Sequence, residues 1–597
     1  MENAATTAFR IRNPIPSFAL ASIGVILCIM PALAQRPGDR IFPNEMNPAY
    51  SIVNLLPTGF KPQVTGMDSL SDGTLVLSTR EDGQGVVAPP ASGKIYLVSG
   101  YAKYSAANVS YKIIAEGLFE PMGVAVVHDT IYAITQNELI QFSDPGGKKD
   151  YASKKTVCKG WPYSGDPFEW AFGLVYKDGS FYTQLSSSSI PEGDYQSNNR
   201  GTVLRMRIDN TFEFLSTGIR RGNGIGLGPD NDVFVTNNQG EWSPTNSLIH
   251  VQKGKWFGYH NGPHYNPENL PVSKPVIWME WYPVSRSPSQ PSLLIQGPYR
   301  GQMITGDCTD PNIRRMFLEK VNNEYQGAVF HFAAMDKAPA NRFLMRANGD
   351  VVVGGLASYL QSDWNWAGGV IYGLQVLRPS GVTPFDILAV RAVKGGFDIE
   401  FTKPVGSGAE NAGNYEVKSW GYIYERRYDS QKQNEYQISP GSVKLSSDRK
   451  RVFLALDNLK EGNVVYIRLK EGIQSQTNES PWVTEAWYTL NSFGTALPLG
   501  PVSDPWVPTA MSGNDRSFQS SSTIAFNPVT RMLIFRGEGI RNASVVIHDM
   551  RGRIRMSLEI VDGANGLLLP ESRFPTGIYR VEIKSRGLQR NQAVAIF

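Results

Sequence analysis

The stretch GPDNDVFVTN, residues 228–237, joins a tight turn to a strand in which apolar and polar side chains alternate. Asp, Asn and Gly suit such turns because they tolerate left-handed backbone angles, and alternation with a period of two is typical of a half-buried strand. Each stretch of this kind predicts a β-hairpin. Five others share the pattern: LSDGTLVLST (70–79), VVHDTIYAIT (126–135), YKDGSFYTQL (176–185), GPYRGQMITG (297–306) and RANGDVVVGG (346–355).

The spacing of these six hairpins predicts the architecture. Their first turn residues stand at positions 72, 129, 178, 230, 300 and 348. A recurrence at roughly fifty residues is typical of the four-stranded blades of a β-propeller. We therefore predict an all-β chain with a six-bladed propeller over about 51–379. Because the repeats are degenerate, an array of β-sandwiches is the alternative.

Further β-rich segments follow the propeller region. Short alternating strands between 384 and 492, such as FDIEFTKPV and NVVYIRL, predict a β-sandwich of the immunoglobulin or fibronectin kind. The proline- and serine-rich segment 493–518 is typical of a linker. Residues 519–597 predict a small further β-sandwich with turns at 551–552 and 576–577.

The first 34 residues have the pattern of an export signal. Arg10 and Arg12 precede an apolar run at 18–30, and an A-x-A sequence ends at Ala34. The run is shorter than the ~20 apolar residues that a helix needs to cross a bilayer. This favours cleavage near Ala34 and a mature chain outside the cytoplasm.

Composition limits the remaining classes of function. The formal net charge is only +4 over 597 residues, and no concentrated Lys/Arg run occurs, which argues against nucleic-acid binding. After the signal, only Cys158 and Cys308 remain, too few for a zinc site built on cysteine. They could pair outside the cytoplasm, but two cysteines in a long chain are more often separate buried thiols.

Three landmarks in the C-terminal segment point to a secretion route. Asn527-Pro528, VVIHDMRGRI (545–554) and GIYRVEI (577–583) stand in this order. The segment resembles the C-terminal sorting domain of the type IX secretion system of Bacteroidota-like bacteria. The resemblance implies that type IX machinery exports the chain across the outer membrane and removes the domain, leaving the protein secreted or on the outer cell surface. An ordinary adhesion-type β-sandwich is the alternative.

Landmarks in the propeller region carry a second resemblance. They are VTGMD (64–68), EPMG (120–123), AFGL (171–174), GIRRGNG (218–224), TNNQG (236–240) and Gly306-Asp307. With these, the region resembles the glucose/sorbosone dehydrogenase family of six-bladed propellers, which bind pyrroloquinoline quinone. The resemblance implies a secreted quinoprotein that oxidises a sugar or polyol. Fold alone does not establish such an activity.

The cofactor implied by this resemblance is an anion with three carboxylates, for which guanidinium groups are suited partners. Arg220 and Arg221, followed by Asn223 and Gly224, occupy the place of an arginine-asparagine pair on the family's cofactor side. We predict that these four residues bind the quinone, with Gly222 and Gly224 allowing the backbone to approach it closely. The alternative is a salt bridge on the rim beside a simple turn.

The general base implied by the family is a histidine, and this chain lacks it. The corresponding stretch PFEWAFG, 167–173, contains no histidine. Glu169 is the predicted substitute, because desolvation beside Phe168 and Trp170 would raise its pKa toward a useful value. Glu169 could instead bind a metal, cap a strand or pair with an arginine.

Two aspartates and two tryptophans complete the predicted site. Asp68 and Asp307 are candidate calcium ligands, against the alternative of carboxylates bonded to neighbouring backbone amides. Trp242 and Trp364 fall in loops after predicted strands, where aromatic faces commonly bind sugars. Packing between blades is the alternative for both.

Two classes of function follow. The first is a quinone-dependent dehydrogenase, which needs an external electron acceptor because no Cys-x-x-Cys-His haem motif occurs. The second is a non-catalytic carbohydrate-binding or scaffolding propeller, which the missing histidine favours. A propeller lactonase is a third reading that nothing in the sequence selects.

Overall fold

The computed structural model describes residues 46–80, 91–166, 168–188, 199–260, 269–357, 370–428 and 431–501, together with seven strands between 523 and 596. In this part of the chain, regular structure consists of β-strands and five short 3-10 turns. No helix among the described residues has the length and apolar character needed to cross a membrane. The export signal and Trp364 lie outside the described residues.

Six antiparallel blades of four strands each follow one another along the chain, and the fifth is part of a larger, eight-stranded sheet. Blade 1 contains β2 (Gln63–Ser69), β3 (Leu75–Arg80), β4 (Gly93–Ser99) and β5 (Ser110–Leu118). Blade 2 contains β6 (Gly123–Val127), β7 (Thr130–Ile134), β8 (Glu138–Ser143) and β9 (Ser153–Lys159). Blade 3 contains β10 (Ala171–Lys177), β11 (Ser180–Leu185), β12 (Thr202–Met206) and β13 (Phe212–Phe214). Blade 4 contains β14 (Ile225–Leu227), β15 (Val233–Asn237), β16 (Asn246–His250) and β17 (Ile277–Met279). Blade 5 contains β18 (Pro288–Leu293), β19 (Met303–Asp307), β20 (Asn312–Val321) and β21 (Glu324–Ala334). Blade 6 contains β22 (Ala340–Met345), β23 (Val351–Leu356), β24 (Tyr372–Pro379) and β1 (Tyr50–Asn54).

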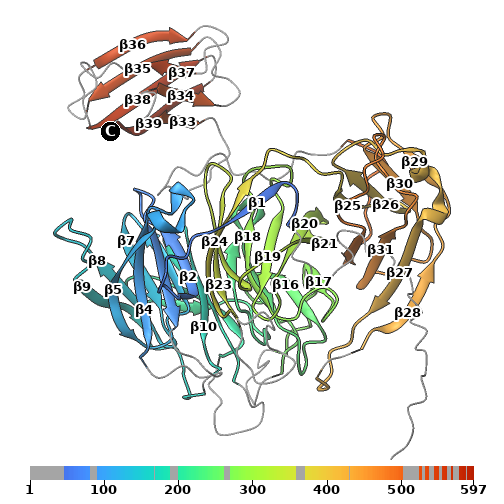
Figure 1. Ribbon diagram of the computed structural model, residues 1–597, viewed down its shortest axis with the longest axis horizontal. Coiled ribbons are helices and arrows are strands. Elements are labelled where there is room, and N and C mark those ends of the chain that lie inside the picture. Colours follow the sequence, from blue (N-terminus) through green and yellow to red (C-terminus); the bar gives the residue numbers. More distant parts are fainter. Residues whose placement is uncertain are drawn as a thin grey trace, which may run out of the picture.

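The six blades contact one another in a closed ring, and Figure 1 shows their strands coloured in chain order from blue to yellow-green. The first strands of successive blades, β2, β6, β10, β14, β18 and β22, contact one another in turn, and β22 contacts β2. The ring closes because β1 pairs with β24, with Tyr50 opposite Pro379. Each of the six predicted turns joins the first two strands of a blade. The periodic hairpins in the sequence thus correspond to the blades of a β-propeller.

Glycines allow the inner strands to approach one another near the axis. A Cβ on Gly66 would lie 2.5 Å from the backbone nitrogen of Val124, and a Cβ on Gly123 would lie 2.6 Å from the carbonyl carbon of Gly173. Neither position has room for a side chain. Farther out, apolar side chains of adjacent blades pack together, for example Leu75 and Leu77 with Val352. Each such fully buried side chain contributes about 1.5–3 kcal/mol to stability.

A middle unit of two sheets follows the last blade. One sheet has the order β25-β26-β30-β29, and the other continues blade 5 as β21-β32-β31-β27-β28. The two sheets share one apolar core, which includes Phe385, Val417 and Val465. The strands are β25 (Ile387–Val393), β26 (Gly396–Phe401), β27 (Tyr415–Gly421), β28 (Gln433–Ile438), β29 (Val443–Leu445), β30 (Arg451–Ala455), β31 (Asn463–Leu469) and β32 (Glu485–Leu490).

The C-terminal segment contains two further sheets, in the orders β33-β34-β37 and β36-β35-β38-β39. Most of the predicted linker, 502–518, lies outside the described residues, as does Pro528. The strands are β33 (Thr523–Asn527), β34 (Met532–Arg536), β35 (Ala543–Asp549), β36 (Ile554–Ile560), β37 (Gly566–Leu568), β38 (Gly577–Ser585) and β39 (Leu588–Ile596).

Candidate functional site

Most of the predicted site residues lie on one face of the propeller. Glu169 directly precedes the inner strand β10, and the segment 220–224 directly precedes the inner strand β14. The loops between the second and third strands of each blade, including the one that carries Trp242, return to the same face because the strands are antiparallel. We call this the site face. The opposite face, which carries the six repeated turns, is the turn face.

Arg220 is buried within the loops of blade 4. Its guanidinium donates hydrogen bonds to the carbonyl oxygen of Gln239 at 2.7 Å and to the carboxylate of Glu241 at 3.3 Å. Its Nε is buried and has no hydrogen-bond partner among the described residues. The backbone passes so close that a Cβ on Gly240, which has φ of +153°, would lie 2.2 Å from the Arg220 Cζ. Glycine at position 240 is favoured by its backbone angle, and a larger residue there would displace the Arg220 guanidinium.

Arg221 differs from Arg220 in its contacts. Its guanidinium lies over the Phe168 ring, with Cζ 4.3 Å from the ring centroid, and donates to the Ser188 carbonyl oxygen at 3.5 Å. No ion pair of Arg221 occurs within the described ranges. Burial and the neighbouring charge of Arg220 lower the pKa of Arg221 to about 10. The negative charge of Asp166 opposes this shift only in part. A poorly solvated cation without an ion-paired carboxylate favours an anionic ligand.

Asn223 points toward an arginine that the sequence analysis missed. It donates from Nδ2 to Asn341 Oδ1 at 2.9 Å, and its carbonyl oxygen accepts from Arg342 at 2.8 Å. Arg342 also donates to the carbonyl oxygens of Thr65 at 2.6 Å and Met122 at 3.3 Å. Arg342 thus joins four blades at the centre of the ring, and burial lowers its pKa to about 9. A charged residue inside the inner-strand sequence ANRFLM was the available signal.

The two glycines of this loop serve packing between strands, which differs from the close approach to a ligand that we predicted. A Cβ on Gly222 would lie 2.5 Å from the Thr236 carbonyl oxygen, and one on Gly224 would lie 2.3 Å from the Gln290 Cα. Gln290 belongs to the inner strand of blade 5. The space beside Gly224 is therefore occupied by the next blade.

Glu169 is fully enclosed, with 0% of its surface exposed. One carboxylate oxygen accepts a hydrogen bond from the Ser164 backbone nitrogen at 2.7 Å, and the other accepts one from the Ser188 hydroxyl at 2.7 Å. The predicted apolar flank is present, since Phe168 and Trp170 pack edge to face nearby. A role as general base stays a prediction.

Arg200 supports the same corner of the site face. Its guanidinium donates at 2.9 Å to the carbonyl oxygens of Ser186 and Trp170. Burial lowers the pKa of Arg200 to about 10, and the negative charge of Glu169 opposes this shift. Unlike Arg221, Arg200 uses its donors to hold the loop backbone. It has a structural reason for its burial.

Trp242 is half-buried and has a left-handed backbone with φ of +56°. Its ring stacks on the His260 ring with centroids 4.3 Å apart and planes at 21°. Burial lowers the pKa of His260, so the imidazole is neutral at pH 7. Trp242 therefore lies with an aromatic partner on the site face, and its sugar-binding role stays a prediction.

The two predicted calcium ligands lie on opposite faces of the propeller. Asp68 is at the turn-face end of β2 and accepts from the backbone nitrogens of Ser69 and Val126, both at 2.8 Å. Asp307 is opposite Pro288, at the site-face end of β18. Asp307 accepts five hydrogen bonds, among them those of the Ser285 hydroxyl and four backbone nitrogens. Both arrangements match the alternative of carboxylates bonded to backbone amides.

The donor set for a metal is correspondingly poor. In the described part of the chain, no group of three or more His, Cys, Asp or Glu side chains could hold a metal ion. The acidic neighbour Asp310 is buried beside Asp307, and its pKa is raised to about 7. It already accepts a hydrogen bond from Arg286 at 3.3 Å. These residues do not fit a calcium centre.

Several buried polar atoms on the site face have no hydrogen-bond partner among the described residues. They include both side-chain polar atoms of Gln239, the Ser187 hydroxyl and the Nε atoms of Arg220 and Arg221. A buried polar group without a partner costs about 1–3 kcal/mol. Native structures contain few such groups, and ligand sites are one of the places where they occur. The site face thus contains enclosed donors and acceptors that no described residue satisfies.

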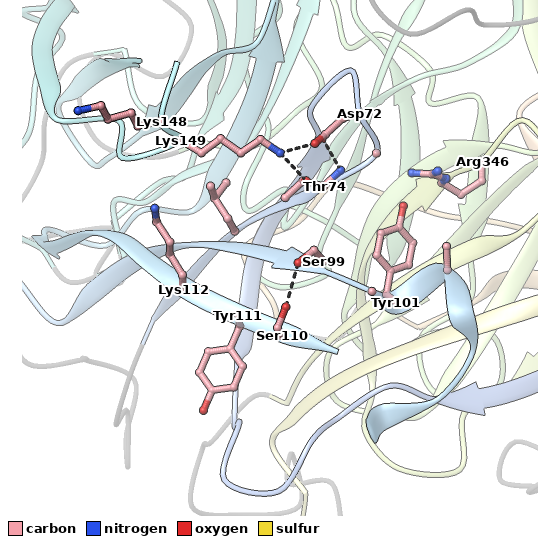
Figure 2. A pocket seen from close by; sticks show the side chains of 14 residues that line it. Asp72, Thr74, Ser99, Tyr101, Ser110, Tyr111, Lys112, Lys148, Lys149 and Arg346 are labelled. Carbon is pink, nitrogen blue, oxygen red and sulfur yellow. Dashed lines mark hydrogen bonds and ion pairs between the residues drawn. The ribbon is translucent and has the colours of Figure 1, made fainter. Parts of the chain in front are cut away.

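A hollow lies on the turn face, between blades 1, 2 and 6 (Figure 2). It has a volume of about 720 Å³ and is bordered by Lys112, Lys148, Lys149 and Arg346, with Asp72 as the acidic residue. Lys149 contacts Asp72 and lies 3.3 Å from the Thr74 hydroxyl. None of the predicted site residues lines this hollow.

The two cysteines do not pair. Cys158 in blade 2 and Cys308 after β19 are both buried free thiols. Burial raises the pKa of Cys158 to about 11 and that of Cys308 to about 12. This agrees with the reading of separate buried thiols and removes the disulfide alternative.

No family model and no curated protein matches the sequence. The structure is similar to solved propellers over somewhat more than half of its length. One is the PQQ-bound form of aldose sugar dehydrogenase from Streptomyces coelicolor, with 16% identity, TM-score 0.39, and coverage of 56% of this chain and 99% of that chain. Another is the PQQ domain of pyranose dehydrogenase from Coprinopsis cinerea, with 12% identity, TM-score 0.38, and coverage of 58% and 99%.

A third similar structure is a gluconolactonase from Xanthomonas campestris, with 13% identity, TM-score 0.33, and coverage of 59% of this chain and 99% of that chain. The similar structures therefore include both oxidoreductases and a hydrolase. They do not select a reaction for this chain.

Proposed function

We propose that the site face binds an anionic quinone of the pyrroloquinoline quinone type and oxidises a sugar or polyol. The observation that carries this proposal is Arg221, a poorly solvated guanidinium beside Arg220 that makes no ion pair among the described residues. A ligand with several carboxylates supplies the missing counter-ions. The unpartnered polar atoms of Gln239 and Ser187 support a polar ligand at the same place.

In this proposal, Arg220 and Arg221 hold carboxylates of the cofactor and Arg342 keeps the centre of the ring positive. When bound, the quinone supplies the acceptor for the hydride. Glu169 acts through Ser188, whose hydroxyl donates to it at 2.7 Å. A sugar hydroxyl bonded to the Ser188 oxygen gives up its proton while Ser188 passes its own to Glu169. Calcium has no suitable ligand set among the described residues and is given no step.

A non-catalytic carbohydrate-binding propeller is the second candidate. The observation that favours it is the enclosure of Glu169, whose two oxygens both accept hydrogen bonds already. A base that is engaged in this way accepts a proton only if one of these bonds rearranges. Under this candidate the protein binds a sugar but neither binds a quinone nor needs an external electron acceptor.

Calorimetric titration of the full chain with pyrroloquinoline quinone, with and without calcium, tests the proposal. We expect binding, and reduction of an electron-accepting dye when an aldose is added. Arg221→Gln should abolish binding. Arg346→Gln is the matched control, because Arg346 also lies over an aromatic ring, 5.2 Å from the Tyr101 centroid, but on the turn face. No heat of binding in the parent chain would overturn the quinone and leave the carbohydrate-binding candidate.

We also propose that the chain is exported through its N-terminal signal and the 519–597 segment, and acts outside the cell or on its outer surface. The support is the order of three sequence landmarks, together with the strands β35 and β38 that two of them form. Deletion of 519–597 should leave the protein in the periplasm of a host with type IX machinery. Normal secretion of the shortened chain would contradict the sorting role.

A further inference from the structure

The middle unit is fastened to blades 4 and 5 by paired strands and a shared core. Strand β21 pairs with β32, with Val329 opposite Trp487. Trp278, Trp420 and Trp487 lie in one buried cluster. The Trp278 backbone nitrogen donates to the Thr489 hydroxyl at 2.7 Å. The position of the middle unit on the propeller is therefore fixed by extensive interactions.

Residues 421–428, which follow β27, extend from this junction across blade 4. Tyr422 and Tyr424 pack on the Trp278 ring, with centroids 5.4 and 5.9 Å away. Tyr424 also fills the space beside Gly258, where a Cβ would lie 2.3 Å from the Tyr424 ring. Gly258 has φ of +91°, so glycine is favoured there by both its backbone and its neighbour. The segment 421–428 is thus anchored by two tyrosines.

Beyond this anchor, the segment reaches the predicted site. The carbonyl oxygen of Glu425 accepts a hydrogen bond from the Trp242 backbone nitrogen at 2.7 Å. The Tyr428 ring lies 5.3 Å from the Arg220 Cζ, and Tyr428 is 39% exposed. Trp242 in turn stacks on His260. The propeller and the middle unit therefore both contribute aromatic side chains near Arg220.

We propose that residues 421–428 form one wall of a saccharide subsite, with Tyr428 and Trp242 as its aromatic surfaces. Sugar rings pack their C–H faces on aromatic rings and form hydrogen bonds around their edges. Glu241, whose side chain is 30% exposed, supplies an acceptor for such an edge. The inference rests on the proposed function in taking the ligand to be a sugar. It gives the middle unit a part in selecting that sugar.

Binding of neutral saccharides to the full chain, measured without quinone, tests this subsite. The probes are glucose, cellotetraose and maltotetraose, and their binding is measured by calorimetry and tryptophan fluorescence. Tyr428→Ala should weaken the Kd of the best-bound probe about tenfold, and Tyr428→Phe should retain affinity within about twofold, because the ring makes the contact. Tyr111→Ala is the matched control, since Tyr111 is 43% exposed but lines the hollow on the turn face.

A second variant tests whether the position of the segment 421–428 affects binding apart from direct contact with the sugar. Gly258→Ala should displace Tyr424 and weaken the same probe, although it changes no group that touches the sugar. Equal affinity of Tyr428→Ala and the parent, or an equal loss in Tyr111→Ala, overturns the subsite, as does a parent chain that binds none of the probes. If the parent binds a probe but shows no quinone binding, the proposed oxidation fails and the subsite stands.

Discussion

Arg221 should destabilise the ligand-free protein, and Arg221→Gln should therefore raise its thermal midpoint. A pKa of about 10 against an ordinary value near 12.5 corresponds to about 3 kcal/mol against the charged side chain at neutral pH. Partial exposure reduces this penalty, and the contact with Phe168 offsets about 1 kcal/mol. We expect a net gain of about 1–2 kcal/mol on substitution. Because the pKa of Arg221 stays near 10, the gain should be the same between about pH 6 and 8.

The gain translates into a measurable shift. An unfolding entropy of about 2.1 cal/mol/K per residue, summed over the propeller and the middle unit, makes 1 kcal/mol equal to about 1 °C. Differential scanning calorimetry should thus place the variant about 1–2 °C above the parent. With quinone at about a hundred times its Kd, the parent should gain about 3 kcal/mol and the order should reverse.

A matched substitution distinguishes a functional cation from a structural one. Arg200→Gln removes three hydrogen bonds to loop carbonyls and should lower the midpoint by several degrees, since each charged hydrogen bond is worth about 1.5–3 kcal/mol. If Arg221→Gln also lowers the midpoint and leaves the quinone-induced shift intact, the reasoning about an uncompensated cation is wrong.

Three other predictions concern pH, thiols and backbone. Glu319 accepts a hydrogen bond from the Ala392 backbone nitrogen, and burial raises its pKa to about 7. The contribution of the Glu319 carboxyl to stability is full below about pH 4.5 and is lost as pH rises through 7. As the pH is raised from about 4.5 to about 7, the free energy of unfolding of Glu319→Gln, measured in urea, should rise by about 2–3 kcal/mol relative to that of the parent. Cys158 and Cys308 should react with a thiol reagent at about pH 8 only after denaturation. Gly240→Ala should lower both the thermal midpoint and quinone affinity, whereas parent-like values would contradict the close approach to Arg220.

The propeller could be predicted from the sequence because its signal is local. Turns such as Asp72-Gly73 and Asn348-Gly349 fix a hairpin with adjacent residues only, and the recurrence of these hairpins counts the blades. The pairing of β21 with β32 has no such local signal. It joins Val329 to Trp487, more than a hundred residues apart, and depends on which sheet edge remains open after the blade has formed.

The candidate site divides in the same way. Arg220 and Arg221 could be identified as candidates from the adjacent residues and from the family that this region of the sequence resembles. The roles of Arg342 and Tyr428 depend on elements distant in sequence, so only the odd placement of an arginine in an apolar strand hinted at the first. The apolar neighbours of Glu169 were predicted and are present. Its hydrogen bond to Ser188, a residue that follows β11, could not be predicted because the two residues are 19 positions apart in the sequence.

The middle unit is part of the same structure as the propeller, and a chain that ends near residue 380 should show this. Without β32, the last strand of blade 5 would expose a hydrogen-bonding edge in an otherwise buried sheet, a recognised cause of aggregation. Trp278 and Val329 would lose the partners that bury them. The shortened chain should therefore elute as aggregates in size-exclusion chromatography and bind saccharide weakly if a monomer is recovered, because Tyr428 and the backbone partner of Trp242 are gone. A monodisperse fragment with full saccharide affinity would show instead that the six blades suffice, and that the contact between Glu425 and Trp242 is incidental to binding.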